Sequence, residues 1–414
     1  MTKPELHLES FTLDTADPAL AENPWVLYAK LRDRHPLFLA CTGADPLHAV
    51  CRYEDVKRLL DDTKGRMREE GATAPAIFGD GPAARLWRAS VSMMDPPDHT
   101  RVRKAISAPF TRKRVEAMRP RVEAIVDSVF DTLEGRTDIE FVQDVALRIP
   151  MRVICDLLGV PESDWPALES WTPDVLRIFL PDAGKPEEIE RINVASANFF
   201  DYFGSLLDQR RRSPCDDLIS ELAAQERIAI SREELVGALR GLLTAGFETT
   251  AATLSATAFC LAREPELLRS LREGQEQRAR AAEEMLRWES PVRVLTRRVG
   301  ENTNLHGVRL PAGTPVLLLL GAANHDPRRF ADPEQVDFSR TNIDHVSFGG
   351  GRHLCLGLFL ARLELQYAYA RMAQDWSEVT LNERSFERRA NAQFPSIERM
   401  QLGVQRADSQ PGRT

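Results

Sequence analysis

Residues 348–357 read FGGGRHLCLG and place one cysteine, Cys355, in a glycine-rich loop that leads directly into an expected helix from Leu358 to Tyr369. The three successive glycines allow positive φ angles and let the backbone approach a flat ligand closely. A cysteine at the start of a helix lies among unpaired N–H groups at the positive end of the helix dipole, which favours its thiolate. The segment therefore predicts a thiolate ligand for a metal, and such a thiolate is one of the axial ligands of haem iron.

The complete order F-G-x-G-x-H-x-C-x-G resembles the haem-binding loop of the cytochrome P450 family. The ordinary alternative is a buried core cysteine beside a glycine-rich turn, which would not require this order. The resemblance implies haem b as the cofactor, with Cys355 as its axial thiolate ligand and with Phe348 and Gly349 in the loop around it. Gly357 would then let the following helix pack against the same ligand.

An apolar stretch from Leu235 to Ala262 carries a second motif, AGFETT at residues 245–250. The stretch is long enough for a membrane span, but it contains Arg240, Glu248 and several threonines, so a helix buried in a large globular core fits it better. A carboxylate in apolar surroundings is costly unless it has a partner or a function. Glu248 is therefore a candidate functional residue.

The resemblance places this motif beside the haem. Ala245 would contact the cofactor, where a local distortion of the helix opens a groove for oxygen and water. Glu248 would relay protons and Thr249 would hold the bound dioxygen and its waters, which is general acid catalysis by a positioned network. The alternative for Thr249 is a hydrogen bond from its hydroxyl back to its own helix.

Glu284 and Arg287 are three residues apart on an expected helix and share one face. This spacing alone is common, but its context, AEEMLRWESP at residues 282–291, resembles the buried ion-pair helix of the same family. By resemblance the third partner is Arg340. A buried, hydrogen-bonded pair of this kind fixes geometry more than it adds stability, so we expect these residues to be structural.

Four donors are expected around the haem propionates, because an ionised carboxylate in a protein needs charge-assisted partners. Residues 95–103, DPPDHTRVR, open a helix with its prolines early and with His99 one turn before Arg103. The resemblance assigns both to the propionates, together with Arg297 and His353. Arg298 is the rival of Arg297, since a shift of one residue is open.

The substrate pocket, by resemblance, draws on residues 67–94, 171–181, 241–249, 292–296 and 394–397. Its apolar candidates are Phe78, Trp87, Val91, Phe179, Leu180, Val294, Leu295 and Phe394. Each alone is more often an ordinary core residue, but together they predict a largely apolar organic substrate.

Arg293 is the unusual residue of this region, four positions before Arg297. We hypothesise that it pairs with a carboxylate or another polar acceptor of the substrate. The alternative is an arginine turned to solvent or to a propionate.

The chain has 414 residues without an evident linker, low-complexity tract or internal repeat. The resemblance covers nearly all of it and implies a mainly α protein with a small β region, the single-domain cytochrome P450 fold, in which a triangular helical prism encloses haem. We expect an N-terminal segment at 1–22, the haem-thiolate domain at 23–404 and a C-terminal tail at 405–414. The hydrophobic content of 43% is ample for such a core.

The remaining elements follow from periodicity and turn residues. Helices are expected at 24–31, 53–61, 114–133, 142–158 and 189–212. Extended segments are expected at 37–39 and 48–51, and residues 304–311 and 314–319 are expected to form a hairpin around Ala312-Gly313.

Composition and termini exclude several classes of protein. The net charge of −8 argues against nucleic acid as a partner. Met1 to Ala21 carries four acidic residues and no apolar run, so we expect neither a signal peptide nor a membrane anchor, and we expect a cytoplasmic, monomeric protein. The other five cysteines show no zinc-like spacing and are expected to be reduced.

The predicted function is that of a haem-thiolate monooxygenase that hydroxylates or epoxidises a small, terpenoid- or polyketide-like molecule. Ferredoxin and ferredoxin reductase would supply its electrons, and a basic surface would dock the ferredoxin; the alternative for these cations is a solvated helix face. The basic residues are Arg101, Lys104, Arg112, Lys113, Arg114 and Arg352. Alternative functions are aromatic coupling, desaturation or peroxide-driven oxidation on the same fold, and, remotely, a haem-based sensor.

Overall fold

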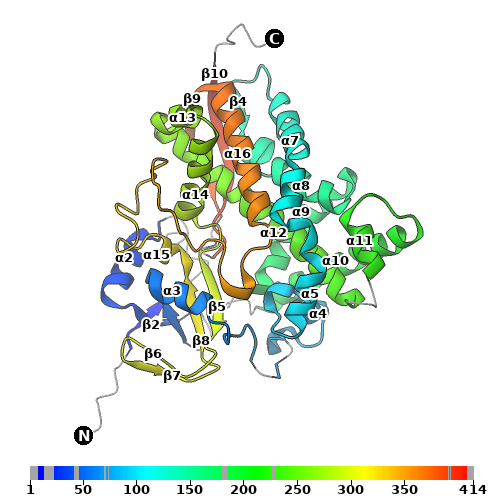
Figure 1. The fold of residues 1–414 in the computed structure, drawn as a ribbon, viewed down its shortest axis with the longest axis vertical. Helices are drawn as coiled ribbons and strands as arrows, with labels where there is room; N and C mark the ends of the chain where they lie inside the picture. Colours follow the sequence, from blue (N-terminus) through cyan, green and yellow to red (C-terminus); the bar gives the residue numbers. More distant parts are fainter. Residues whose placement is uncertain are drawn as a thin grey trace.

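The structure is a computed structural model that describes residues 8–13, 23–41, 46–69, 71–72, 74–179, 185–225, 230–389, 391 and 393–407. It is mainly helical with a small β region, as the sequence predicts, and in Figure 1 the larger sheet lies at the lower left of the helical body. The helices are α2 Trp25–Arg34, α3 Tyr53–Leu60, α4 Pro82–Ala89, α5 Asp98–Ile106, α6 Arg112–Ala117, α7 Arg119–Asp131, α8 Arg148–Leu158, α9 Trp165–Leu176, α10 Pro186–Arg212, α11 Leu218–Gln225, α12 Arg232–Arg263, α13 Pro265–Ser270, α14 Gln275–Glu289, α15 Leu320–Asn324 and α16 Leu358–Asp375.

The strands belong to three sheets. They are β1 Ser10–Thr12, β2 Leu37–Cys41, β3 Leu47–Val50, β4 Asp138–Glu140, β5 Val294–Arg298, β6 Thr303–Leu305, β7 Val308–Leu310, β8 Pro315–Leu319, β9 Trp376–Arg388 and β10 Ile397–Arg406. One sheet has the order β1-β2-β3-β8-β5, a second has the order β4-β10-β9, and β6 pairs with β7 alone.

The predicted buried helix is α12, which crosses the interior and packs against α4, α8, α10, α14 and α16. Ser231 begins it with a capping box, in which Ser231 Oγ accepts from the backbone N–H of Glu234 at 3.3 Å and the Glu234 carboxylate accepts from the Ser231 N–H at 2.8 Å. Glu234 also accepts from Arg101 of α5. The capped end therefore fixes α5 against the central helix. No helix in the described part of the chain has the length and apolarity that crossing a bilayer requires.

Two expected helices are interrupted in the structure. The segment 114–133 is divided into α6 and α7 at Met118, because Pro120 lacks an N–H and is accommodated in the first turn of a new helix. The segment 142–158 begins with a π-helical turn, Val142–Ala146, before α8. Periodicity predicts the buried faces of both segments, whereas the breaks depend on local backbone geometry.

The larger sheet is buried on both faces, and β8 shows this in its alternation. Val316 and Leu318 enter one apolar cluster, while Leu317 and Leu319 enter another. A strand covered on both sides reads as a continuous apolar run, which explains the uniform composition of this segment. β8 pairs parallel with β3 and antiparallel with β5, so β5 is held at the edge of the sheet next to the interior.

The prediction that residues 304–311 and 314–319 pair as a hairpin around Ala312-Gly313 is wrong. β6 pairs with β7 through a two-residue turn, His306-Gly307, and both turn residues have positive φ, 51° and 84°. This combination matches the twist of flanking strands and closes a tight hairpin. β8 is instead drawn into the larger sheet, where its four apolar side chains are buried.

Candidate functional site

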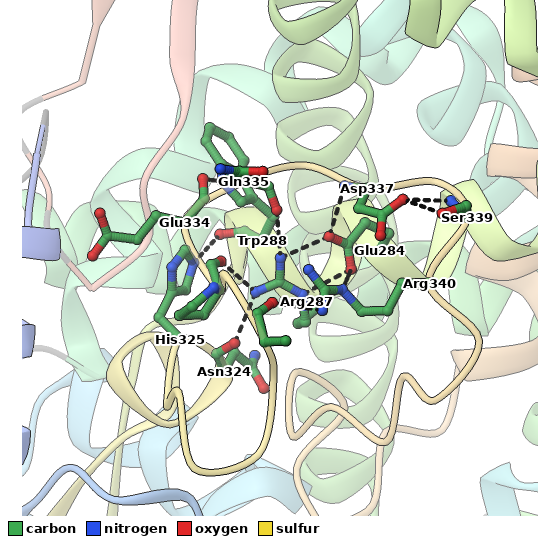
Figure 2. Close-up of polar contacts among 12 residues, drawn as sticks. Glu284, Arg287, Trp288, Asn324, His325, Glu334, Gln335, Asp337, Ser339 and Arg340 are labelled. Carbon is green, nitrogen blue, oxygen red and sulfur yellow. Dashed lines mark hydrogen bonds and ion pairs between the residues drawn. The ribbon is translucent and has the colours of Figure 1, made fainter.

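Arg287 of α14 is fully buried, and all five N–H groups of its guanidinium have acceptors (Figure 2). Nε and Nη2 donate to the two carboxylate oxygens of Glu284 at 2.8 and 2.7 Å. The other three N–H groups donate to the carbonyl oxygens of Asn324, Pro333 and Gln335, at 2.9, 2.7 and 3.2 Å. One side chain thus anchors the end of α15 and the segment that follows it.

Glu284 is equally buried and accepts from a second arginine. Arg340 Nε lies 3.1 Å from Glu284 Oε2, and the backbone N–H of Asp337 donates to Oε1 at 3.0 Å. The sequence predicts this trio by resemblance, and the structure brings its three members into direct contact (Figure 2). The irregular segment 331–340 is held to α14 by these bonds.

The cysteine loop is fixed at its start by Asn324. Its side-chain amide donates to Ser290 Oγ and Ser347 Oγ, both at 2.7 Å, and its Oδ1 accepts from the N–H of Val346 at 2.9 Å. Ser347 Oγ donates in turn to the carbonyl of Leu286 at 2.6 Å. The residues just before Phe348 are therefore tied to the C-terminal end of α14.

The helix after the loop is tied to α14 as well. Glu283 accepts from Arg362 of α16 at 2.6 and 2.8 Å, and His345 Nε2 lies 3.3 Å from the same carboxylate. Burial raises the pKa of Glu283, but His345 and Arg362 outweigh it and bring the pKa to about 2. Residues 345–362 are thus bonded to α14 at both ends.

The loop itself requires glycine at two positions. Gly349 and Gly351 have φ angles of +70° and +59°, which side chains rarely adopt, and a Cβ on Gly351 would lie 2.6 Å from the carbonyl oxygen of Leu60. The backbone N–H of Cys355 donates to the carbonyl of Phe348 at 2.9 Å. The loop consequently returns on itself, with Phe348 beside the backbone of Cys355 and the Arg362 guanidinium 4.8 Å from the Phe348 ring centre.

Burial raises the pKa of the Cys355 thiol, while the backbone N–H of Gly357 and the charges of Arg103 and Arg362 lower it. The donors predicted from the sequence at the start of the helix are thus present. For a thiol without a bound metal, however, burial has the larger effect on the pKa. A bound metal ion deprotonates a thiol outright and favours the same donors. The donor set therefore suits a sulfur ligand to a metal.

The four residues predicted to bind carboxylates gather near this loop. The rings of His99 and His353 lie 4.2 Å apart, and Arg103 donates to the carbonyl oxygen of Leu354. Arg297 is 7% exposed. Burial, together with the nearby charges of Arg297, His99 and Arg103, lowers the pKa of His353 to about 2. Burial likewise lowers the pKa of Arg297 to about 10, opposed by Asp95.

These groups have unused hydrogen-bonding capacity. The Nε2 atoms of His99 and His353 are buried without a partner among the described residues, and Arg297 donates to the carbonyl of its own neighbour, Thr296, at 2.9 Å. Two cations and two imidazoles with free donors suit two carboxylates. The arrangement fits the propionates of the haem that the sequence implies.

Arg298, the rival of Arg297, points elsewhere. Adjacent residues of a strand face opposite sides of the sheet. Arg298 Nη1 donates to the carbonyl of Gly313 at 2.8 Å, and its Nη2 lies 3.5 Å from Glu69. The structure therefore leaves Arg297 as the cation that joins the histidines.

The face of α12 that carries the AGFETT motif is open at two positions. Ala245 is exposed in the middle of a buried helix, and a Cβ at Gly241, one turn earlier, would meet open space. Thr249 Oγ1 donates to the carbonyl of Ala245 at 2.9 Å, which is the back-bond considered as an alternative. α12 is assigned as one continuous helix, so the expected local distortion is not seen.

Glu248 has a partner that the sequence does not indicate. Arg389, which directly follows β9, lies 3.3 Å from Glu248 and 3.0 Å from Glu398 of β10. A cavity of about 230 Å³ opens here between α12 and the β9-β10 sheet, and Glu248, Ser255, Arg389 and Glu398 are among its lining residues. β9 and β10 carry no motif, so only the tertiary contact identifies Arg389.

The apolar pocket candidates come from four regions of the chain. Those of three regions pack in the same apolar cluster as α12, whereas Leu295 and Val294 pack against the two clusters of the larger sheet. Phe78 and Trp87 are buried, whereas Val91, Phe179, Val294, Leu295 and Phe394 are partly exposed. The segment of Phe394 is joined to the start of β5, because Gln393 Nε2 donates to the carbonyl of Val294 at 3.2 Å. Leu180 lies outside the described residues.

Arg293 is not among these pocket residues. Its side chain is 1% exposed, its Nη2 lies 3.3 Å from Glu289, and its guanidinium stacks 5.1 Å from the Trp25 ring centre. Burial lowers its pKa, and Glu289 opposes this. The structure thus gives Arg293 an intramolecular carboxylate in α14 and an aromatic partner in α2, in place of the predicted substrate contact.

The chain is similar to known proteins over most of its length. A family model described as "Cytochrome P450" matches residues 164–395. Cytochrome P450 107B1 of Saccharopolyspora erythraea is 35% identical over 375 residues, 88% of this chain and 90% of that protein. Mycinamicin IV hydroxylase/epoxidase of Micromonospora griseorubida is 37% identical over 327 residues, 77% of this chain and 79% of that protein.

Among solved structures, P450BioI in complex with an acyl carrier protein ligated to hexadec-9Z-enoic acid has a TM-score of 0.87. The two chains are 30% identical, and the match covers 94% of this chain and 100% of that chain.

The buried network predicts a large difference between two arginines of α14. Arg287→Ala should lower the free energy of unfolding by about 3–5 kcal/mol, because it leaves the Glu284 carboxylate buried and uncompensated. Arg280→Ala is the matched control: Arg280 pairs with the exposed Glu276 at 2.6 Å, and its loss should cost about 1 kcal/mol or less. Urea unfolding followed by circular dichroism measures both. Equal costs would contradict the proposed importance of the network.

Proposed function

Because the chain belongs to the cytochrome P450 family, a family of haem-thiolate enzymes, we propose that Cys355 is the thiolate ligand and that the enzyme hydroxylates or epoxidises a largely apolar secondary metabolite. The family assignment makes the protein a cytochrome P450 monooxygenase with haem as its cofactor. The observation that carries the assignment of individual residues is the gathering of Arg103, Arg297, His99 and His353, with unused donors, beside the Cys355 loop.

The haem, when bound, supplies the activation of molecular oxygen, and the residues of this chain hold and orient it. The Gly357 N–H and the charges of Arg103 and Arg362 stabilise the thiolate of Cys355. His99, Arg103, Arg297 and His353 would donate to the propionates. The network around Arg287 holds Asn324, which fixes the start of the loop that carries His353 and Cys355.

Glu248 and Thr249 are proposed to move protons. Glu248 faces the cavity beside Arg389 and can take up protons on its carboxylate oxygens. Thr249 Oγ1, which donates to the Ala245 carbonyl on the open face of α12, would hold a proton and pass it on at this face. This acid–threonine pair favours an O₂-dependent reaction over a peroxide-driven one.

The substrate proposal rests on the apolar pocket candidates and on relatives. Val91, Phe179 and Phe394 offer partly exposed apolar surface in the cluster of α12, and Val294 and Leu295 of β5 are partly exposed as well. One similar protein is named as a hydroxylase and epoxidase of mycinamicin IV. A terpenoid- or polyketide-like substrate of secondary metabolism is consistent with both.

The electron supply is proposed to be ferredoxin with ferredoxin reductase. Lys104 of α5 and Arg112, Lys113 and Arg114 of α6 are exposed. Arg101 is engaged by Asp98 and Glu234, so it contributes less free charge than the sequence suggests. An exposed basic group on an acidic protein suits transient docking of an acidic partner.

The ligand assignment is tested with Cys355→Ser. The ferrous carbon monoxide complex should lose its thiolate absorption signature, because a serine oxygen does not donate charge to iron as a thiolate does. Cys215→Ser is the control, since Cys215 is exposed and should leave the spectrum unchanged. A thiolate signature that persists in Cys355→Ser would refute the assignment.

Proton delivery is tested with Thr249→Val against Thr253→Val. Both threonines donate to a carbonyl four residues earlier, at 2.9 and 3.0 Å, but only Thr249 borders the open face. Thr249→Val should lower product formed per O₂ consumed by about 10²-fold, and Glu248→Gln should slow product formation similarly. Thr253→Val should retain wild-type coupling, and a similar loss in both threonine variants would reveal a merely structural effect.

The docking surface is tested by charge reversal. Lys113→Glu with Arg114→Glu should slow reduction by an acidic ferredoxin at low salt, and the difference should fade as added salt screens the charges. Arg212→Glu, at the exposed end of α10, changes the net charge without touching this surface. Stopped-flow reduction rates that do not depend on ionic strength would contradict the docking proposal.

A further inference from the structure

Arg240 of α12 is a buried cation without a carboxylate partner in the described part of the chain. It is 2% exposed, and burial lowers its pKa to about 10 with no opposing charge. Its Nη2 donates to Ser90 Oγ, its guanidinium lies 5.4 Å from the Phe179 ring centre, and its Nε is buried without a partner. A guanidinium has five donors, so most of its capacity is unused.

Other buried arginines are compensated. Arg287 uses all five donors, Arg293 pairs with Glu289, and Asp326 counteracts the effect of burial on Arg32. Arg297 lies beside Asp95 and belongs to the proposed propionate cluster. Since an isolated buried charge is costly, Arg240 calls for an anionic or strongly polar partner.

Glu364 of α16 is another buried ionisable side chain, but unlike Arg240 it can become neutral. It is also buried without a partner for its Oε2, but burial raises its pKa well above the usual value, so it can remain neutral. An arginine cannot lose its proton in the same way. Its charge has to be met by a group outside the described contacts.

The position of Arg240 points to the substrate. Ser90 directly precedes Val91, and Phe179 stacks on the guanidinium, so Arg240 contacts two of the predicted pocket segments. Gly241 follows it on the open face of α12, and Ala245 is exposed one turn further. At 1.5 Å per residue, Arg240 lies about 7.5 Å along the helix from Ala245.

We propose that Arg240 binds a carboxylate of the substrate, which would make the substrate an amphipathic organic acid with an apolar body. This inference rests on the proposed function and specifies its substrate class. The carboxylate at Arg240 would place the apolar body along Gly241 and Ala245. Oxidation would then occur several bonds away from the carboxylate, and Phe179 would pack against the body or the guanidinium.

The test is a titration of the ferric holoenzyme with acids and their esters, followed by the spin-state shift of the Soret band. The probes are dodecanoic acid and the tricyclic abietic acid, each beside its methyl ester. A charge-assisted hydrogen bond should make at least one acid bind about tenfold or more tightly than its ester. Equal affinities, or the absence of binding by both acids, would overturn the proposal.

Three variants locate the effect. Arg240→Gln should remove the preference for the acid while the ester still binds, and Arg240→Lys should retain part of it. Arg85→Gln is the control, because Arg85 is an exposed arginine of α4 that pairs with Glu233 at 2.7 Å. A preference that survives in Arg240→Gln, or that is lost equally in Arg85→Gln, would overturn the proposal.

The thiolate signature of the ferrous carbon monoxide complex is recorded for every protein used. A normal signature without an acid preference refutes the role of Arg240 alone. A wild-type spectrum without the signature refutes the proposed function, and the inference with it. If Arg240→Gln does not fold, Arg240→Lys decides, because a weakened preference for the acid supports the proposal and an unchanged one contradicts it.

Discussion

The buried contact between Arg287 and Glu284 is the constraint on which the cysteine loop depends. Its bonds hold the carbonyl of Asn324, at the end of α15, and those of Pro333 and Gln335, which belong to a segment with little regular structure of its own. Such segments have no backbone ladder to fix them, so side-chain bonds replace it. Because a buried ion pair is a weak source of stability, its value here lies in fixing the path of the chain toward Cys355.

The same principle applies along the rest of the site, where α14 supplies successive anchors. Glu283 holds α16 through Arg362, and the carbonyl of Leu286 accepts from Ser347 just before the loop. The larger sheet then sets Arg297 by the register of β5 on β8, with Arg297 opposite Val316. A loop rich in glycine is thus anchored where its chemistry needs it, since both of its ends are bonded to one helix.

Among the buried donors without a partner in the described part of the chain, two groups lie near the candidate site and have different meanings. His99, His353 and Arg297 lie together beside the loop, where we propose that the propionates of the family's cofactor bind. Arg240 is separate, next to Ser90 and Phe179, where a substrate is expected. A buried donor without an acceptor is costly, so in both groups we infer that a ligand supplies the acceptor. The residues around each donor indicate what kind of ligand this is.

The sequence by itself determined the family, the mainly helical class, the loop around Cys355 and the pair of Glu284 and Arg287, because short motifs with fixed spacing encode local backbone geometry. The resemblance to the family added one long-range partner, Arg340. Only the tertiary structure decided which other long-range partners meet. It paired β8 with β5 and β3 instead of forming the expected hairpin, and it brought Arg389 to Glu248.

The difference between what the sequence indicates and what the fold decides is clearest for two arginines, Arg293 and Arg240. Its position in the sequence, four residues before Arg297, favoured Arg293 as the contact for a polar group of the substrate. The fold instead turns Arg293 toward Glu289 and Trp25. The sequence indicated Arg240 only as a charge in an apolar stretch. Which buried cation has a carboxylate and which lacks one depends on the packing of α12 against distant segments. Such contacts between remote parts of the chain leave no local periodicity or spacing, so only the folded chain reveals them.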